Sequence, residues 1–143
     1  MGLDVSHDCW HGAYSAFMRW REEIAKTAGL PPIHLMEGFY KPGNLRWLDN
    51  KASFVVESAE KSLPISWDCL KPSPLHELLY HSDCEGEIAW VSCATIADAL
   101  EALIPLLPTG DGGGHIGNWK DKTTAFIDGL RLAATKKETV KFR

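Results

Sequence analysis

The stretch WHGAYSAFMRWREEIAKTAG, residues 10–29, decides how the N-terminal part of the chain folds. Its charged residues fall on other faces than its apolar ones, which recur at helical spacing at Trp10, Tyr14, Phe17, Ile24 and Ala28. Gly29 and the two prolines that follow it end the pattern. We therefore predict an amphipathic helix that begins near Asp8 and ends just before Gly29.

On either side of this helix the sequence favours short β-structure. Residues 3–5 are partly apolar and predict a first strand that leads into the helix. Residues 30–74 hold six of the eight prolines, separated by β-prone stretches. We expect short strands and loops there, around 33–36, 54–56 and 65–67.

The second half of the chain predicts two more helices and a closing strand. Ser92 can cap a helix whose apolar stripe ends near Pro105, which kinks or ends it. A third helix runs from about Asn118 to Thr135, and the alternating residues 139–142 predict a last strand. Residues 75–80 favour a strand; the alternative is a short helix with Ser73 and Pro74 at its start.

These elements predict one α+β domain over residues 1–143. With 143 residues, of which 45% are hydrophobic, the chain can bury one good core, and two domains are improbable at this length. Helices and strands interleave without a strict repeat, so we expect a small mixed sheet packed with about three helices. A doubly wound α/β arrangement is the second choice.

Composition excludes some classes of function. A net charge of −4 with no basic block argues against nucleic acid as a partner. No apolar run approaches the roughly 20 residues that span a bilayer, so we expect no membrane partner. The four cysteines are expected to be reduced thiols in a cytoplasmic protein, because the chain is too apolar to need disulfides and shows no export signal. The oligomeric state stays open.

Two short clusters carry the groups that bind metals or move protons. In the first, residues 7–11, His7 and His11 are four apart and would share one side of the first helical turn. That spacing suits one metal ion with Asp8 or a distant carboxylate, and the helix start also suits a carboxylate or phosphate ligand. The alternative is that Asp8 simply caps the helix. Cys9 would be an activated thiol only with a base within reach.

In the second cluster, residues 81–87, the chain would leave the sheet edge through a turn at Gly86. Polar groups would surround this turn. These groups are His81, Asp83, Glu85 and Glu87. Carboxylates that lie this close together recruit a cation. The alternative is an ordinary polar turn in which Asp83 accepts hydrogen bonds from backbone amides.

Two hypotheses follow, and whether the protein is an enzyme stays open between them. In the first, it is a small metal-dependent hydrolase that binds a divalent ion such as zinc through His7, His11, His81 and Asp83. Its catalytic groups are Asp83, Glu85 and Glu87, with Glu85 or Glu87 as the general base on a bound water. In the second, it is a non-enzymatic accessory protein that binds a small molecule or a protein, and the clusters are structural.

Both clusters also carry a resemblance. The segments GLDVSHDCWHGAYSAF, residues 2–17, and LLYHSDCEGEI, residues 78–88, resemble segments of small uncharacterised proteins of bacteria and their phages. The resemblance extends over most of the chain. It indicates a bacterial or phage protein, and it implies no activity and no catalytic residues.

Overall fold

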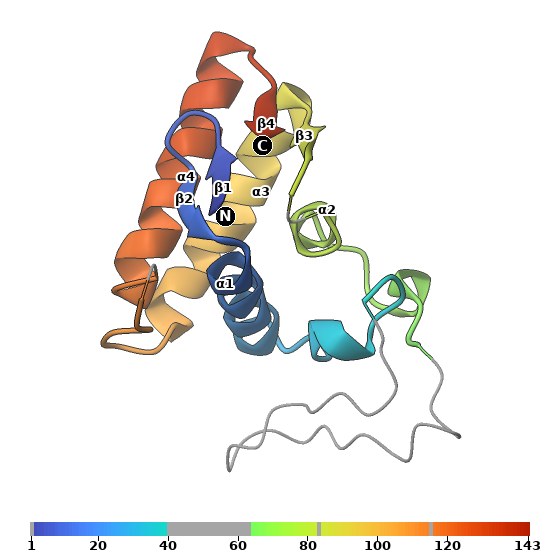
Figure 1. Cartoon of the computed structure of the whole chain (residues 1–143). Helices are drawn as coiled ribbons and strands as arrows, with labels where there is room; N and C mark the ends of the chain where they lie inside the picture. Colours follow the sequence, from blue (N-terminus) through green and yellow to red (C-terminus); the bar gives the residue numbers. More distant parts are fainter. Residues whose placement is uncertain (1, 40–63, 83, 115) are drawn as a thin grey trace.

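The computed structural model describes residues 2–39, 64–82, 84–114 and 116–143 (Figure 1). The strands are β1 (Gly2–Val5), β2 (Trp10–Ala13), β3 (Gly86–Ile88) and β4 (Val140–Phe142). The α-helices are α1 (Tyr14–Thr27), α2 (Leu75–Leu79), α3 (Trp90–Leu103) and α4 (Trp119–Lys136). Short 3₁₀ turns cover Ile33–Leu35, Trp67–Cys69 and Ile104–Leu106. The strand predicted at 54–56 lies outside the described residues.

The four strands form one sheet in the order β2-β1-β4-β3, and every pairing is antiparallel. The last strand therefore lies between the first and the third, which joins the two ends of the described chain. Asp4 N donates to Arg143 O at 2.8 Å, and Arg143 N donates to Asp4 O at 2.9 Å. The α+β class and the single compact domain are confirmed, with an antiparallel sheet in place of the predicted mixed one.

The helices cover one face of this sheet. Along β1 and β4, exposed and buried residues alternate, so Leu3, Val5, Val140 and Phe142 point into the core. The long helices α3 and α4 pack against each other, and Figure 1 shows them behind the strands. The opposite face of the strands carries Asp4, His11 and Lys141, which are exposed. We call this solvent-facing side the open face.

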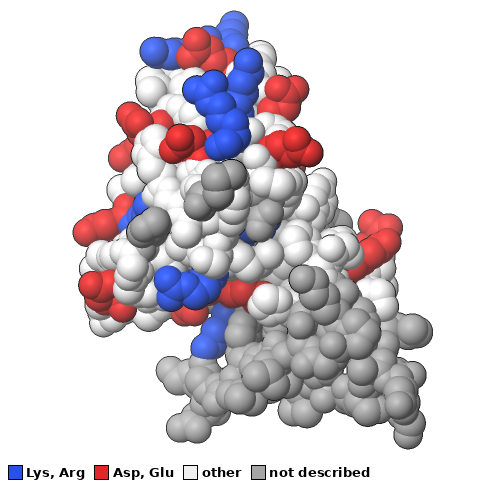
Figure 2. Space-filling view, viewed as in Figure 1, with Lys and Arg blue, Asp and Glu red and all other residues white. Residues whose placement is uncertain are grey.

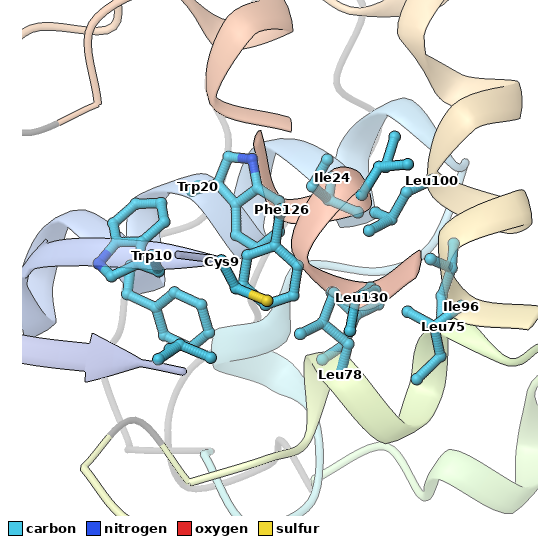
Figure 3. Packing of buried hydrophobic residues seen from close by; sticks show 14 of the residues in the cluster. Cys9, Trp10, Trp20, Ile24, Leu75, Leu78, Ile96, Leu100, Phe126 and Leu130 are labelled. Carbon is cyan, nitrogen blue, oxygen red and sulfur yellow. The ribbon is translucent and has the colours of Figure 1, made fainter. Parts of the chain in front are cut away.

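Aromatic side chains fill the centre of the core (Figure 3). The Trp20 and Phe126 rings stack with centroids 4.8 Å apart, and Trp10 meets Phe17 edge to face at 5.2 Å. Each such side chain buries about 150–250 Å², so this cluster supplies a large share of the apolar burial. The indole N–H of Trp20 donates to Thr123 Oγ1 at 3.0 Å, whereas the equally buried indole N–H of Trp10 has no hydrogen-bond partner among the described residues.

The predicted first helix is correct from Tyr14 onward and wrong before it. Residues 7 and 8 form the turn of a β-hairpin between β1 and β2, with φ of 61° for His7 and 57° for Asp8. Two successive residues with positive φ match the twist of paired strands, and His and Asp tolerate this conformation better than most residues. Trp10 is therefore buried from a strand, although its spacing from Phe17 also fits a helix.

Residues 75–80 were predicted as a strand, and the structure corrects this prediction. Leu75, Leu78 and Leu79 are buried with the 3–4 spacing of a helical face, and they lie on α2. Ser73 Oγ accepts a hydrogen bond from Leu75 N at 3.2 Å, which supports the first turn. A run of apolar residues this short fits either element, and tertiary packing decides between them.

The helices α3 and α4 and the strand β4 largely confirm the predictions made from the sequence. Asn118 caps α4 by accepting a hydrogen bond from Asp121 N at 3.1 Å. Helix α3 starts two residues before Ser92, and the 3₁₀ turn that contains Pro105 ends it. The closing strand β4 is present. Within the part of the chain that the structure describes, no helix has both the length and the apolar content to span a membrane.

Candidate functional site

The first cluster lies at the β1–β2 turn, on the open face, beside two adjoining hollows. The smaller hollow has a volume of about 250 Å³, and the larger one about 480 Å³. They share Ser6, His7 and Arg143. Asp4, Asp8 and His11 line the smaller hollow, and Glu138, Thr139 and Lys141 line the larger one. Figure 2, viewed as Figure 1, shows basic side chains flanked by acidic ones over this region.

His11 is held between two carboxylates. Its Nδ1 lies 2.7 Å from Asp4 Oδ1 on the neighbouring strand, and its Nε2 lies 3.1 Å from Asp8 Oδ1 in the turn. Hydrogen bonds to Asp4 and then to Asp8 raise the pKa of His11 above its ordinary value. Both ring nitrogens are thus engaged, and the carboxylates favour the charged imidazolium.

We expect this arrangement to appear in an NMR titration of the histidine side chains. His11 should titrate at a higher pH than an unperturbed histidine, whose pKa is about 6.5. Asp4→Asn should lower the pKa of His11 more than Asp8→Asn does, because the bond to Asp4 is the larger cause. Equal midpoints in the wild type and both variants would contradict this geometry.

The same shift sets the sign of a small pH effect on stability. The pKa of His11 is raised in the folded state. Its ion pairs therefore stabilise the hairpin fully below about pH 6.5, the value expected for the unfolded chain. This contribution is lost as the pH rises through the folded-state pKa. The ring is 59% exposed, so we expect water to screen most of the effect.

His7 joins a second set of polar groups. Its Nδ1 lies 2.8 Å from Ser6 Oγ, and its Nε2 lies 3.0 Å from Glu138 Oε1. Ser6 Oγ also accepts a hydrogen bond from Lys141 N at 2.9 Å, so the hydroxyl bridges β1 and β4. The side chain of His7 is only 12% exposed. His7 is thus fixed by one neighbour in sequence and by one that lies 131 residues away.

His81 belongs to a different part of the fold. Its ring stacks on Phe142 at 4.0 Å between centroids, against the buried face of the sheet, and its nitrogens face the carbonyl oxygens of Ser82 and Glu87 at 2.8 and 3.2 Å. His11 lies on the open face of β2, three strands from β3, or about 14 Å away. Among the described residues, no hydrogen bond or ring contact joins His81 to His7 or His11.

Two of the three proposed carboxylates of the second cluster are described by the structure. Glu85 and Glu87 are exposed, and Asp83 lies outside the described residues. Glu87 faces Lys141 across the β3–β4 pairing, without an ion pair between them. Within residues 2–39, 64–82, 84–114 and 116–143, no three His, Cys, Asp or Glu side chains are grouped to hold a metal ion. The zinc site stays a prediction.

Elemental analysis tests that prediction directly. Protein purified without chelator and without metal-affinity resin should carry about one zinc or other divalent ion per chain if the predicted ligands bind it. His7→Gln and His81→Gln should then both lower the metal content. Far less than one ion per chain in the wild type would count against the metal-dependent hydrolase.

Cys9 does not have the environment of a nucleophile. Its thiol is buried against the core, and burial, followed by the nearby Cys93, raises the pKa of Cys9 to about 12. At neutral pH the sulfur is therefore protonated and unreactive. All four cysteines are free; Cys69 and Cys84 are exposed, whereas Cys9 and Cys93 are buried.

The sequence identified part of this site. His7, Asp8 and His11 were singled out, and all three line the smaller hollow. Ser6, Glu138, Lys141 and Arg143 were missed, because only the pairing of β1 with β4 brings residues 138–143 to the first hairpin. The alternation in residues 139–142 predicted the strand and which of its side chains share a face, but not its partner.

Comparisons with protein-family models, with curated proteins and with solved structures found no match for this chain. The resemblance to small bacterial and phage proteins thus stays a prediction.

Proposed function

We propose that this protein binds a small molecule with a phosphate or carboxylate group on the open face of the sheet. One observation carries the proposal. Lys141 and Arg143 line the larger hollow, and among the described residues neither cation has an ion-pair partner.

The pairing of the acidic groups makes these cations available. Asp4 and Asp8 are both engaged by His11, and Glu138 is engaged by His7. The carboxylates that line the two hollows therefore already have partners, whereas the two cations do not. A ligand with an anionic group would supply the missing partner, and a guanidinium beside an ammonium suits phosphate or carboxylate oxygens.

The size and lining of the site support a small polar ligand. A volume of about 480 Å³ lies in the range of small-molecule sites. The lining consists mainly of polar and charged side chains, so a purely apolar ligand would leave them unpaired. The site also lies beside a hairpin turn and at the ends of strands, where a rigid sheet positions the side chains.

The experiment is an NMR titration of the ¹⁵N-labelled protein with inorganic phosphate at low ionic strength. We expect shifts centred on the amides of residues 6–8 and 138–143. Lys141→Gln and Arg143→Gln should each weaken binding about threefold to fivefold, because one exposed charge interaction contributes up to about 1 kcal/mol. Added sodium chloride should weaken binding further.

Lys136→Gln is the matched control. Lys136 is also exposed and lies at the end of α4, outside both hollows. Its loss changes the net charge equally and should leave phosphate binding unchanged. Equal weakening by all three variants, or shifts spread over the whole surface, would show a general charge effect and would overturn the proposal.

A further inference from the structure

We infer that Ser6, His7 and Glu138 form a proton relay that makes Ser6 Oγ a nucleophile toward carboxylic esters. The inference rests on the proposed function for the anionic group of the substrate, and it adds an activity to a site proposed above as binding only. Ser6 Oγ lies 2.8 Å from His7 Nδ1, and Glu138 Oε1 lies 3.0 Å from His7 Nε2, so the two partners contact the two nitrogens of one imidazole.

The hydrogen-bond partners fix the tautomer of a neutral His7. An ionised Glu138 only accepts hydrogen bonds, so the proton of the ring must be on Nε2. Nδ1 then has a free lone pair and accepts the hydroxyl proton of Ser6. This order, from hydroxyl to imidazole to carboxylate, is the one that general-base activation of a serine requires.

The backbone holds the nucleophile in place. Lys141 N donates to Ser6 Oγ at 2.9 Å, which orients the oxygen while its own proton points to His7. Ser6 lines both hollows, so a ligand in either one can reach it. The relay uses Nδ1 toward serine and Nε2 toward the carboxylate, the reverse of the arrangement in serine proteases. The roles of the three groups are the same.

The step balances without a cofactor. Ser6 Oγ forms a bond to the ester carbonyl carbon, and its proton passes to His7 Nδ1. The bond between that carbon and the alkoxy oxygen then breaks, and the alcohol leaves with the proton from Nδ1. Water, activated by the same nitrogen, hydrolyses the acyl-serine and returns the free hydroxyl.

The cations of the site indicate the substrate class. Arg143 lines both hollows together with Ser6 and His7, so it is the group available to stabilise the negative charge on the carbonyl oxygen. Lys141 lines only the larger hollow and would bind an anionic group elsewhere in the substrate. The expected substrate is therefore a small ester that also carries a carboxylate or phosphate.

Hydrolysis of p-nitrophenyl acetate tests the relay apart from anion binding, because this ester is neutral. The wild type should hydrolyse it, and Ser6→Ala should lower kcat/KM at least about 100-fold, the low end of general-base contributions. A fluorophosphonate should label the wild type on Ser6, as located by peptide mass spectrometry. No hydrolysis above the rate in buffer, or labelling elsewhere, would overturn the inference.

Glu138→Gln covers the case in which Ser6→Ala does not fold. Glu138 is half-exposed and is a positioning residue, so we expect kcat to fall about tenfold with KM unchanged, and Glu138→Asp to restore part of it. Asp98→Asn, on the exposed face of α3, should leave kcat unchanged. Equal kcat in the wild type and Glu138→Gln would overturn the relay. A failure of phosphate binding in the NMR titration would instead overturn only the proposed anion binding.

Discussion

Gly129→Ala is expected to destabilise the protein by about 2 kcal/mol, although alanine is the better helix former. A Cβ at this position would lie 2.7 Å from the carbonyl oxygen of His7 and would overlap the Sγ of Cys9. The closest neighbours are a turn backbone and a buried thiol, so neither moves without disturbing the hairpin. The steric cost should exceed the roughly 1 kcal/mol that alanine gains in a helix.

Urea unfolding measures this effect, and Asp128→Ala is the control. Asp128 is the preceding residue on α4 and is exposed, so its replacement should change the free energy of unfolding by less than about 0.5 kcal/mol. Cys9→Ala combined with Gly129→Ala should recover part of the loss, because it removes one of the two obstacles. A stabilising Gly129→Ala would show that the hairpin does not pack this closely on α4.

The second large effect is expected at Arg21. Its guanidinium is fully buried, and Nη1 donates to the carbonyl oxygens of Leu78, Leu79 and His81 at 3.3, 3.1 and 2.5 Å. The group also stacks over Phe17 at 4.6 Å. Arg21→Met keeps the apolar volume but removes the donor from carbonyls at the end of α2. We expect a loss of about 3 kcal/mol, since each buried acceptor without a partner costs about 1–3 kcal/mol.

Arg19→Met is the matched control on the same helix. Arg19 donates to Gly112 O at 3.1 Å from an exposed position, so water can replace it, and the loss should stay below about 1 kcal/mol. Thermal unfolding should separate the two variants by several degrees. Equal effects at Arg19 and Arg21 would contradict the role assigned to the buried guanidinium in joining α1 to α2 and to residue 81.

Local sequence patterns predicted the elements whose signals are local. Helix α4 has a periodic apolar face, β4 shows alternation, and β1 is a short, partly apolar stretch; all three were found. The α+β fold class followed from the presence of both helical periodicity and strand alternation in one chain. No local signal fixed the strand order, because the pairing of β1 with β4 joins residues more than 130 positions apart.

The hairpin shows why the start of α1 was misplaced. Trp10 lies at a spacing that fits a helix with Phe17, yet it is buried from β2. The information lay in residues 7 and 8, whose positive φ turns the chain back onto β1. His and Asp are only moderately favoured there, and glycine would have given a clearer signal. The apolar period alone therefore extended the helix too far.

Of the candidate site, only the two histidines and Asp8 could be predicted from the sequence. His7 and His11 were expected to lie on one side of a helical turn. In the structure they lie on a hairpin, and each contacts its own carboxylates. The cations come from β4 and from the residue that follows it, and charge alone does not distinguish them from other exposed lysines and arginines. Tertiary contacts supply that distinction, since they leave Lys141 and Arg143 without an ion pair in the described part of the chain.

The most direct test of anion binding on the open face is a crystal structure of the protein soaked in sodium selenate, with an anomalous map recorded at the selenium edge. We expect an anomalous peak within about 4 Å of both Lys141 Nζ and the Arg143 guanidinium, next to the larger hollow. The peak should disappear in the Lys141→Gln, Arg143→Gln double variant. Selenium bound only at other surface cations, with these two side chains facing open solvent, would contradict it.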